Sequence, residues 1–159
     1  MMKNENGVTL VALVIMVIVI AILATVATYT GISTYREMQV TAFVKRVETV
    51  EEKVKSLKKR AEVDSVLSNE LGLGSTTATY GDSLSSKYDN VSTVFSTLKI
   101  SNSNDSDYRY FTNEKLESQL KLKDIEGDYI INFKTGDVYS VEGVMYKGNR
   151  VHSISEVRE

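Results

Sequence analysis

Residue types that carry out chemistry in enzymes are sparse in this sequence of 159 residues. His152 is the single histidine, and cysteine is absent. Neither a nucleophile–base triad nor a zinc site can therefore be assembled around this histidine. We expect His152 to be a half-exposed residue of a strand. The sequence predicts a protein that is not an enzyme and that needs no cofactor.

Clustered carboxylates are the remaining residues that could do chemistry. Asp105 and Asp107, with Asn102 and Asn104, offer the oxygen ligands that calcium prefers. Their spacing lacks the glycine and the distal glutamate of an EF-hand, so we expect a solvated loop, with calcium as the alternative. Asp124, Glu126 and Asp128 alternate before a predicted strand and are interpreted as a polar edge rather than as paired catalytic carboxylates.

The composition narrows the function classes further. The formal net charge is −2 and charged residues make up 25% of the chain, so no basic excess indicates nucleic-acid binding. The absence of cysteine excludes a disulfide framework. We therefore expect a fold that depends on packing alone.

The N-terminal part of the chain contains a long apolar run. No charged residue occurs between Asn6 and Tyr35, and residues 8–27 would form a helix about 30 Å long, which matches the hydrocarbon core of a bilayer. Three interpretations are open: a secretory signal cleaved after Thr25-Val26-Ala27, a permanent single-span anchor, or an assembly module.

An amphipathic helix is predicted directly after this run, over residues 36–72. Its apolar residues recur at steps of four and three, which places them on one helical face. The members of this seam are Phe43, Val47, Val50, Val54, Leu57 and Ala61. We expect one helix from about residue 8 to about residue 70, ended by Gly72 or Gly74, with the seam packed on the chain's own domain rather than in a coiled coil.

The C-terminal half predicts a small α+β head. Residues 73–107 are rich in Ser, Thr and Asn and are interpreted as a connecting region, in which "VSTVFSTLKI" is strand-like and helix remains open. Residues 108–159 predict a short helix capped by Thr112 or Asn113, with Leu116 and Leu120 facing inward. The runs "DYIINF", "DVYSV", "GVMY" and "RVHSI" predict an antiparallel meander with a Gly148-Asn149 turn, one face of which buries the seam.

The residues Gly7, Val8, Thr9 and Leu10 ("GVTL"), a short polar leader at 1–7 and a charge-free stem at 8–35 resemble a type IV prepilin. The family includes type IV pilins and type II secretion pseudopilins. The resemblance implies a pilin-like fold in which the long helix packs against the small sheet. It also implies a prepilin peptidase that cuts between Gly7 and Val8 and methylates the new amine of Val8.

The resemblance further implies a structural subunit that polymerises through its hydrophobic helix. Its partners would be the prepilin peptidase, an inner-membrane assembly platform and other pilin subunits. It would cross the cytoplasmic membrane once, with the head outside, before it enters a cell-surface filament. The alternative is a single-span membrane protein whose exported domain binds a ligand or partner.

One residue departs from the family pattern. Most filament-forming members carry glutamate as the fifth residue of the mature chain, and this sequence has Ala12 there. The amine of Val8 would lack a charged partner in the apolar core, which costs several kcal/mol unless the amine neutralises or reaches water. We therefore expect either a minor subunit, such as one at a filament tip, or a lineage that assembles without this ion pair.

Overall fold

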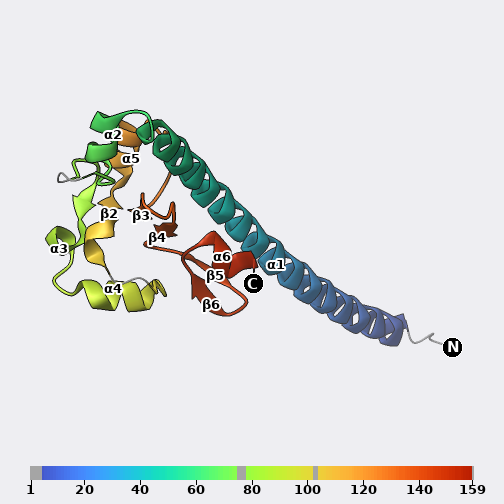
Figure 1. Ribbon diagram of the computed structural model, residues 1–159. Helices are drawn as coiled ribbons and strands as arrows, with labels where there is room; N and C mark the ends of the chain where they lie inside the picture. Colours follow the sequence, from blue (N-terminus) through green and yellow to red (C-terminus); the bar gives the residue numbers. More distant parts are fainter. Residues whose placement is uncertain (1–4, 75–77, 102–103, 159) are drawn as a thin grey trace. The chain divides into compact units, whose positions relative to one another are not determined.

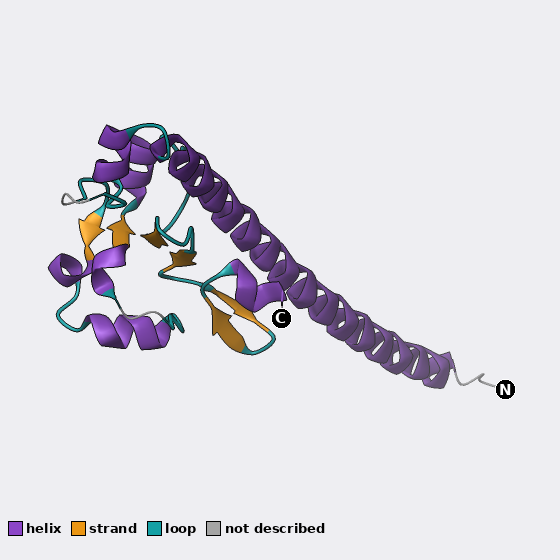
Figure 2. Ribbon diagram, in the orientation of Figure 1, coloured by secondary structure: helices purple, strands orange, loops and turns teal. Residues whose placement is uncertain are grey.

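The computed structural model describes residues 5–74, 78–101 and 104–158. The chain divides into two units, Met1–Gln39 and Val40–Glu159, and helix α1 (Glu5–Ala61) contributes to both (Figure 1). The second unit, called the head below, contains the other described helices and strands. The structure confirms the predicted fold class, α+β with a long N-terminal helix and a small antiparallel sheet (Figure 2).

Helix α1 ends earlier than the predicted residue 70. It stops at Ala61, and a second helix, α2 (Ser65–Glu70), follows after a short turn. The carboxylate of Asp64 accepts hydrogen bonds from the amides of Val66 and Leu67, both at 3.1 Å. An aspartate side chain that satisfies the first free amides of a new helix favours a break at this point.

The predicted stop at Gly72 does end a helix, but this helix is α2 rather than α1. Gly72 has a φ of +76°, its amide donates to Asn69 O at 3.0 Å, and the amide of Leu73 donates to Ser68 O at 2.9 Å. These bonds form a Schellman motif, in which glycine adopts the left-handed conformation at no steric cost.

The connecting region contains more regular structure than predicted. It forms β1 (Asp82–Ser83), α3 (Leu84–Lys87), α4 (Val91–Thr97) and the 3-10 turn η1 (Asp105–Asp107). The strand-like run around Phe95 is the helix α4, because Asn90 caps it by accepting from the amide of Thr93 at 3.3 Å. Helix α4 buries Phe95 against the sheet, and an amphipathic helix in this position needs apolar residues on one face alone.

The main sheet has the order β1-β2-β3-β4 and is antiparallel throughout. Its longer strands are β2 (Tyr108–Phe111) and β3 (Tyr129–Asn132), and β4 (Val138–Ser140) lies at the far edge. Strand β2 was not predicted. Helix α5 (Asn113–Leu120) connects β2 to β3, is capped by Thr112 and buries Leu116 and Leu120, as its sequence predicts.

The predicted four-stranded meander is wrong, because its last two strands form a separate hairpin. Strands β5 (Val144–Tyr146) and β6 (Asn149–Val151) pair only with each other. Lys147 and Gly148 occupy the turn with φ values of +47° and +86°, as a type I′ turn requires. The predicted Gly148-Asn149 turn is therefore one residue too late. The chain then enters α6 (Ile154–Arg158) instead of extending the strand.

The main sheet is buried on both faces, not on one as predicted. One hydrophobic cluster joins α1, α2 and α5 to Phe111, Tyr129 and Ile131. A second joins α3 and α4 to Tyr108, Tyr110 and Ile130. Figure 1 shows α3 and α4 on the other side of the sheet from α1. Successive strand residues point to opposite faces, so full burial of β3 requires cover on both sides.

Candidate functional site

The apolar part of α1 is the most distinctive feature of the described chain. Its large apolar side chains from Leu10 to Val26 are 46–66% exposed on all sides of the helix. The mean hydropathy reaches 3.3 over an 18-residue window. Among the described residues, α1 is the one helix that is both long enough and apolar enough to cross a membrane, judged by length and composition alone. A helix that is apolar all round belongs in an apolar environment.

Two threonine hydroxyl groups of α1 form hydrogen bonds with backbone carbonyls of the same helix. Thr25 Oγ1 donates to the carbonyl oxygen of Ala21, and Thr28 Oγ1 donates to that of Ala24, both at 2.8 Å. A hydroxyl bonded to the preceding turn does not need water. These two threonines therefore add little to the cost of placing the helix in lipid or among other helices.

The predicted processing residues lie at the beginning of α1. Gly7, Val8 and Thr9 are helical, and their side chains are outside the described part, as are residues 1–4 of the leader. Leu10 is 66% exposed, and Ala12 is exposed too. The first acidic residue after Ala12 is Glu37, so the stem itself offers the amine of Val8 no carboxylate.

The seam of the amphipathic half lies in the core of the head. All six of its residues are at most 6% exposed. They belong to the cluster that also contains Phe111, Leu116 and Ile131. The members are Phe43, Val47, Val50, Val54, Leu57 and Ala61. The helix that carries the apolar stem is thus also a central element of the head's core.

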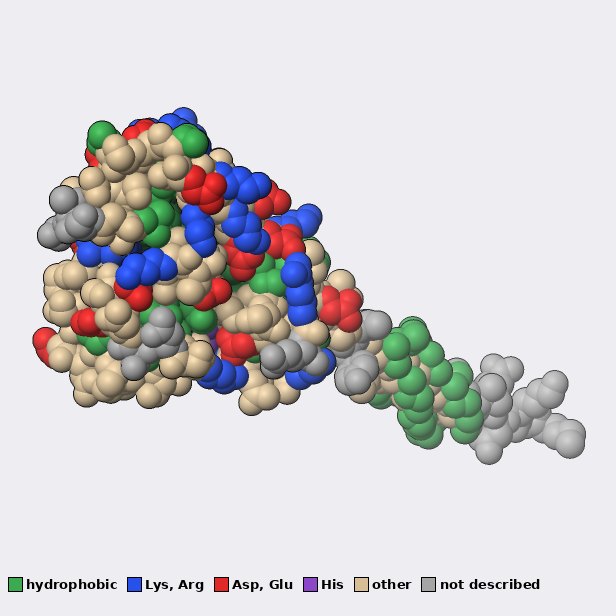
Figure 3. Space-filling view, in the orientation of Figure 1, with side chains coloured by type: hydrophobic (Ala, Val, Ile, Leu, Met, Phe, Trp, Pro, Cys, Tyr) green, Lys and Arg blue, Asp and Glu red, His purple; other side chains and the backbone are tan. Residues whose placement is uncertain are grey.

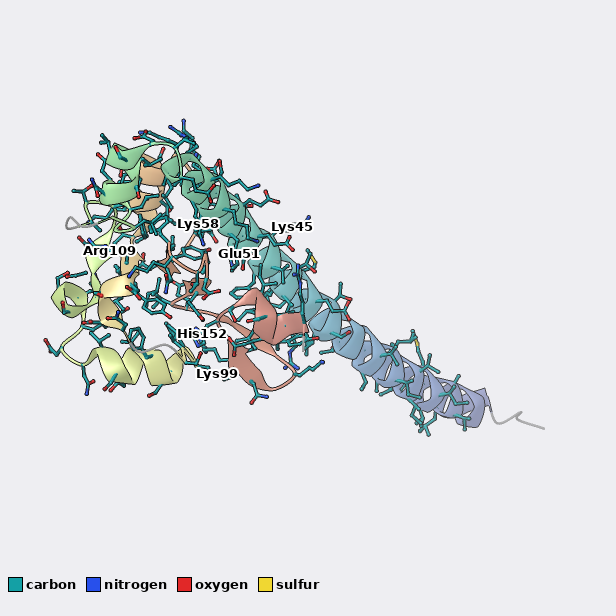
Figure 4. All side chains as sticks on the ribbon, viewed as in Figure 1. Lys45, Glu51, Lys58, Lys99, Arg109 and His152 are labelled. Carbon is teal, nitrogen blue, oxygen red and sulfur yellow. The ribbon has the colours of Figure 1, made fainter. Side chains whose placement is uncertain are left out.

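Polar contacts flank the seam and hold the head to α1. Arg46 Nη1 lies 2.8 Å from a carboxylate oxygen of Glu126, and Arg158 Nη2 lies 2.9 Å from one of Glu48. Figure 4 shows Lys58 on the same helix, where its ammonium group donates to the carbonyl oxygen of Lys134. The contacts come from the loop before β3, from α6 and from the turn after β3, so three separate segments are tied to α1.

Three of the carboxylates considered for calcium or catalysis have separate partners in the structure. Asp107 forms an ion pair with Lys134, and Asn102 lies outside the described residues. Glu126 is paired with Arg46, while Asp128 accepts from the hydroxyl of Tyr110.

Within the described ranges, no group of three or more His, Cys, Asp and Glu side chains could hold a metal ion. Neither Asp105 with Asp107 nor the 124–128 series belongs to such a group, and the calcium alternative, which also uses Asn102, stays a prediction.

His152 is a buried residue between β6 and α6 rather than the half-exposed strand residue that the sequence predicts. It is 3% exposed and follows the last residue of β6. Its Nδ1 lies 2.8 Å from the carbonyl oxygen of Ser140, and its backbone amide donates to Glu156 at 2.8 Å. These contacts give His152 a structural role at the junction of β4, the hairpin and α6.

A hollow of about 500 Å³ lies beside β2, lined by Arg109, Leu84, Asp107 and Lys134 among others. Arg109 donates to the carbonyl oxygens of Tyr80 and Gly81 at 2.9 and 2.8 Å, and to that of Ala78 at 3.3 Å. Burial lowers the pKa of its guanidinium, although Asp82 acts in the other direction. Sequence reasoning missed Arg109, because a half-buried arginine that binds backbone carbonyls leaves no pattern in the sequence.

Two tyrosines on opposite faces of the sheet have strongly perturbed hydroxyls. Burial raises the pKa of Tyr110, and the hydrogen bond and charge of Asp128 raise it further. Burial also raises the pKa of Tyr129 to about 12, against the opposing effect of Arg46. Both hydroxyls remain protonated donors at neutral pH. They stabilise the loop before β3 and provide no general base.

Fold and site together define a class: a small α+β head built on the amphipathic half of a helix whose N-terminal half can cross a membrane by length and composition. No protein-family model, curated protein or solved structure matches this chain.

Proposed function

We propose that this chain is a structural subunit of a type IV pilus or a related pseudopilus, and that it is not an enzyme. The observation that carries the proposal is the dual character of α1. Its N-terminal part is apolar on all sides, and the same helix goes on to supply the buried seam of the head. A subunit built in this way carries its anchor and its head on one helix.

Hydrophobic energetics permit assembly through such a helix. Leaving lipid for a bundle of similar helices exchanges one apolar environment for another, so the transfer is nearly neutral in hydrophobic terms. The inward hydrogen bonds of Thr25 and Thr28 remove one source of cost. Packing and polar details then decide whether copies assemble. In this proposal the head forms the outer surface, and the partners are prepilin peptidase, the assembly platform and sister subunits.

Ala12 favours a minor position in the filament. The proposed mature chain begins at Val8, and the residue one helical turn later is an alanine. An amine without a carboxylate partner is costly in an apolar bundle, and much less so where water reaches it. A tip position, or an assembly path without this ion pair, fits the sequence. The tip position would make the subunit rare in the filament, whereas the assembly path without the ion pair would allow copies of it to be neighbours.

Mass spectrometry of the mature N-terminus tests the proposal. The chain should be isolated from membranes of cells that contain a prepilin peptidase, and its N-terminal peptide should be N-methylated Val8. Gly7→Leu should block this processing, because a side chain there hinders the close approach of the peptidase. Gly31→Ala is the matched control, since a Cβ at Gly31 meets nothing within 4 Å.

The same mass spectrometry of the N-terminus also distinguishes a permanent membrane anchor from a secretory signal. Ala12 also suits a single-span membrane protein with an exported partner-binding domain, which needs no ion pair between copies. A mature chain that starts at Met1 would support this second function and reject processing. A start near Thr28 would mean a secretory signal, and the seam would then belong to a secreted domain.

A further inference from the structure

Charge is segregated between α1 and the remainder of the head. Residues 40–61 contain seven basic and three acidic residues, a net charge of +4. Residues 62–159 contain ten basic and sixteen acidic residues, a net charge of −6. This difference is large for a chain whose overall net charge is only −2. The surface of α1 and the surface of the remaining head are thus electrostatically complementary.

Only part of the positive charge on α1 is used within the molecule. Arg46 pairs with Glu126, Lys55 lies 3.4 Å from Glu51, and Lys58 donates to a backbone carbonyl. Within residues 40–61, the side chains of the other cations are without an ion pair or hydrogen bond to any residue that the structure describes. They are Lys45, Lys53, Lys59 and Arg60.

These cations gather on the side of α1 that faces away from the core. Residues two positions after each seam residue lie about 200° around the helix. On α1 this set is Lys45, Thr49, Glu52, Ser56 and Lys59, and all five are exposed. With Lys53 and Arg60 beside it, we call this set the basic face. Figure 3 shows basic side chains along this edge of the head, with acidic side chains among them.

A shallow hollow lies at the centre of the basic face. It has a volume of about 420 Å³ and is lined by Glu52, Lys55, Ser56, Lys59 and Arg60. Ser56 provides the space, because a short side chain sits between three long cationic ones. Its hydroxyl has no hydrogen-bond partner within the described part of the chain. Glu52 contributes a carboxylate to the lining and Lys55 already pairs with Glu51, so Lys59, Arg60 and the free hydroxyl of Ser56 are the groups that suit an incoming carboxylate.

We propose that the basic face around Ser56 docks an acidic side chain from residues 62–159 of a second copy of this chain. The complementary net charges of the two surfaces, +4 and −6, favour this occupant. The net charge of −6 on residues 62–159 makes nucleic acid or anionic lipid a less favourable occupant, because either would lie close to this negative charge. The inference rests on the second form of the proposed function, an assembly path without the ion pair in which copies of this chain are neighbours, and it names the surface of the head that takes part.

Photo-crosslinking from position 56 tests the proposal directly. The chain has no cysteine, so Ser56→Cys can be labelled uniquely with a benzophenone maleimide in membranes that contain the full-length chain. Illumination should give covalent dimers and higher species, and peptide mapping should place the attachment in residues 62–159 of the second copy. Adducts to lipid, to nucleic acid or to another protein, or no adduct at all, would overturn it.

Charge variants test whether electrostatics drives the contact. Lys59→Glu with Arg60→Glu, in the Ser56→Cys background, should lower the dimer yield about tenfold, and 0.5 M salt should lower the parent yield in the same direction. The double variant Lys59→Gln with Arg60→Gln removes the same two positive charges without placing acidic residues at the end of α1. It should give an intermediate loss of dimer. Lys121→Glu with Lys123→Glu changes the net charge equally on the acidic surface and should lose no dimer. Equal loss in both double glutamate variants would overturn the docking site.

The crosslinking experiment tests the docking surface, and the mass of the N-terminal peptide tests the filament function, so each proposal can be rejected without the other. Processed Val8 without crosslinks from position 56 would reject only the docking surface. Crosslinks between chains that begin at Met1 would reject the filament function and retain the contact as a membrane-bound dimer.

Discussion

Ser140 and His152 are joined by two hydrogen bonds that link the main sheet to the hairpin. His152 Nδ1 lies 2.8 Å from the carbonyl oxygen of Ser140, and the amide of Ser140 donates to the carbonyl oxygen of His152 at 2.8 Å. Both residues are buried. The residue after β6 thus satisfies the outer backbone groups of Ser140 at the edge of β4, which would otherwise be open to pairing with another strand.

Removing the imidazole should therefore weaken the head. His152→Ala leaves the Ser140 carbonyl without its partner and creates a cavity, so we expect a loss of about 2–4 kcal/mol in the free energy of unfolding. Asparagine places an amide nitrogen near the position of Nδ1, so His152→Asn should recover part of the loss. Urea unfolding of the full chain in detergent, followed by its tyrosine fluorescence, measures both. Equal stability of His152→Ala and the parent would contradict the structural role.

Glu156 should make the stability of the head depend on pH. Its burial acts to raise its pKa, but the ion pair with Lys99 and the amides of His152 and Ser153 outweigh burial and lower it. Figure 4 shows Lys99 and His152 near each other in the head. A lowered folded-state pKa gives stability that is fully present above the unfolded value of 4.5 and is lost as the pH falls through the folded value.

The test compares acid unfolding of the parent with that of Glu156→Gln. The stability difference between them should be largest at neutral pH and should shrink below about pH 4.5. Glu117→Gln is the control, because Glu117 is exposed on α5; it should leave the acid profile unchanged. A difference that persists undiminished at low pH would mean that the charge of Glu156 contributes nothing.

Close backbone approach, and not only turn geometry, should make Gly143 intolerant of a side chain. Gly143 and Gly136 both have positive φ, +62° and +93°. A Cβ on Gly143 would lie 2.4 Å from the carbonyl oxygen of Val151, while a Cβ on Gly136 meets nothing within 4 Å. Gly136→Ala should cost about 1–2 kcal/mol from φ alone, and Gly143→Ala about 3 kcal/mol or more. Similar losses in a thermal unfolding experiment would show that the hairpin moves to admit the methyl group.

The seam on α1 should dominate the stability of the head. Leu57 is 4% exposed, and Leu57→Ala should cost about 2–5 kcal/mol because it leaves a cavity in the cluster. Val63 is 90% exposed just beyond the end of α1, so Val63→Ala should change the free energy of unfolding by less than about 0.5 kcal/mol. A small effect of Leu57→Ala in urea unfolding would contradict the packing of α1 in the core.

The seam could be predicted because its information is local. The steps of four and three that include Val50 and Val54 follow from the period of the helix, and the cap at Thr112 follows from its own hydroxyl. The separation of β5 and β6 could not be predicted. It depends on whether Ser140 pairs with the next strand or with His152, and only tertiary packing decides between them.

The break in α1 and the burial of both sheet faces were missed for a related reason. Asp64 suits the surface of a continuous helix as well as the cap of a new one. The composition around Phe95 suits a strand as well as α4. In the candidate site, the exposure of the stem was predictable from its uniform apolarity. The contacts of Arg109 and Arg46 were not, because they join residues far apart in the chain.

Glutamate at position 12 separates the two explanations of an unpaired amine in the proposed filament. Ala12 lies four residues after Val8, one helical turn away, so Ala12→Glu would offer the amine of the mature chain a carboxylate partner. For a dedicated tip subunit we expect unchanged incorporation, because its position in the filament does not depend on this ion pair. Immunogold labelling of the head along sheared filaments measures the number and position of copies. Ala21→Glu adds the same charge about 20 Å from Val8 and should only impair anchoring. Greater incorporation along the filament with Ala12→Glu, but not with Ala21→Glu, would reject the tip role and leave a subunit whose abundance is limited by the missing carboxylate.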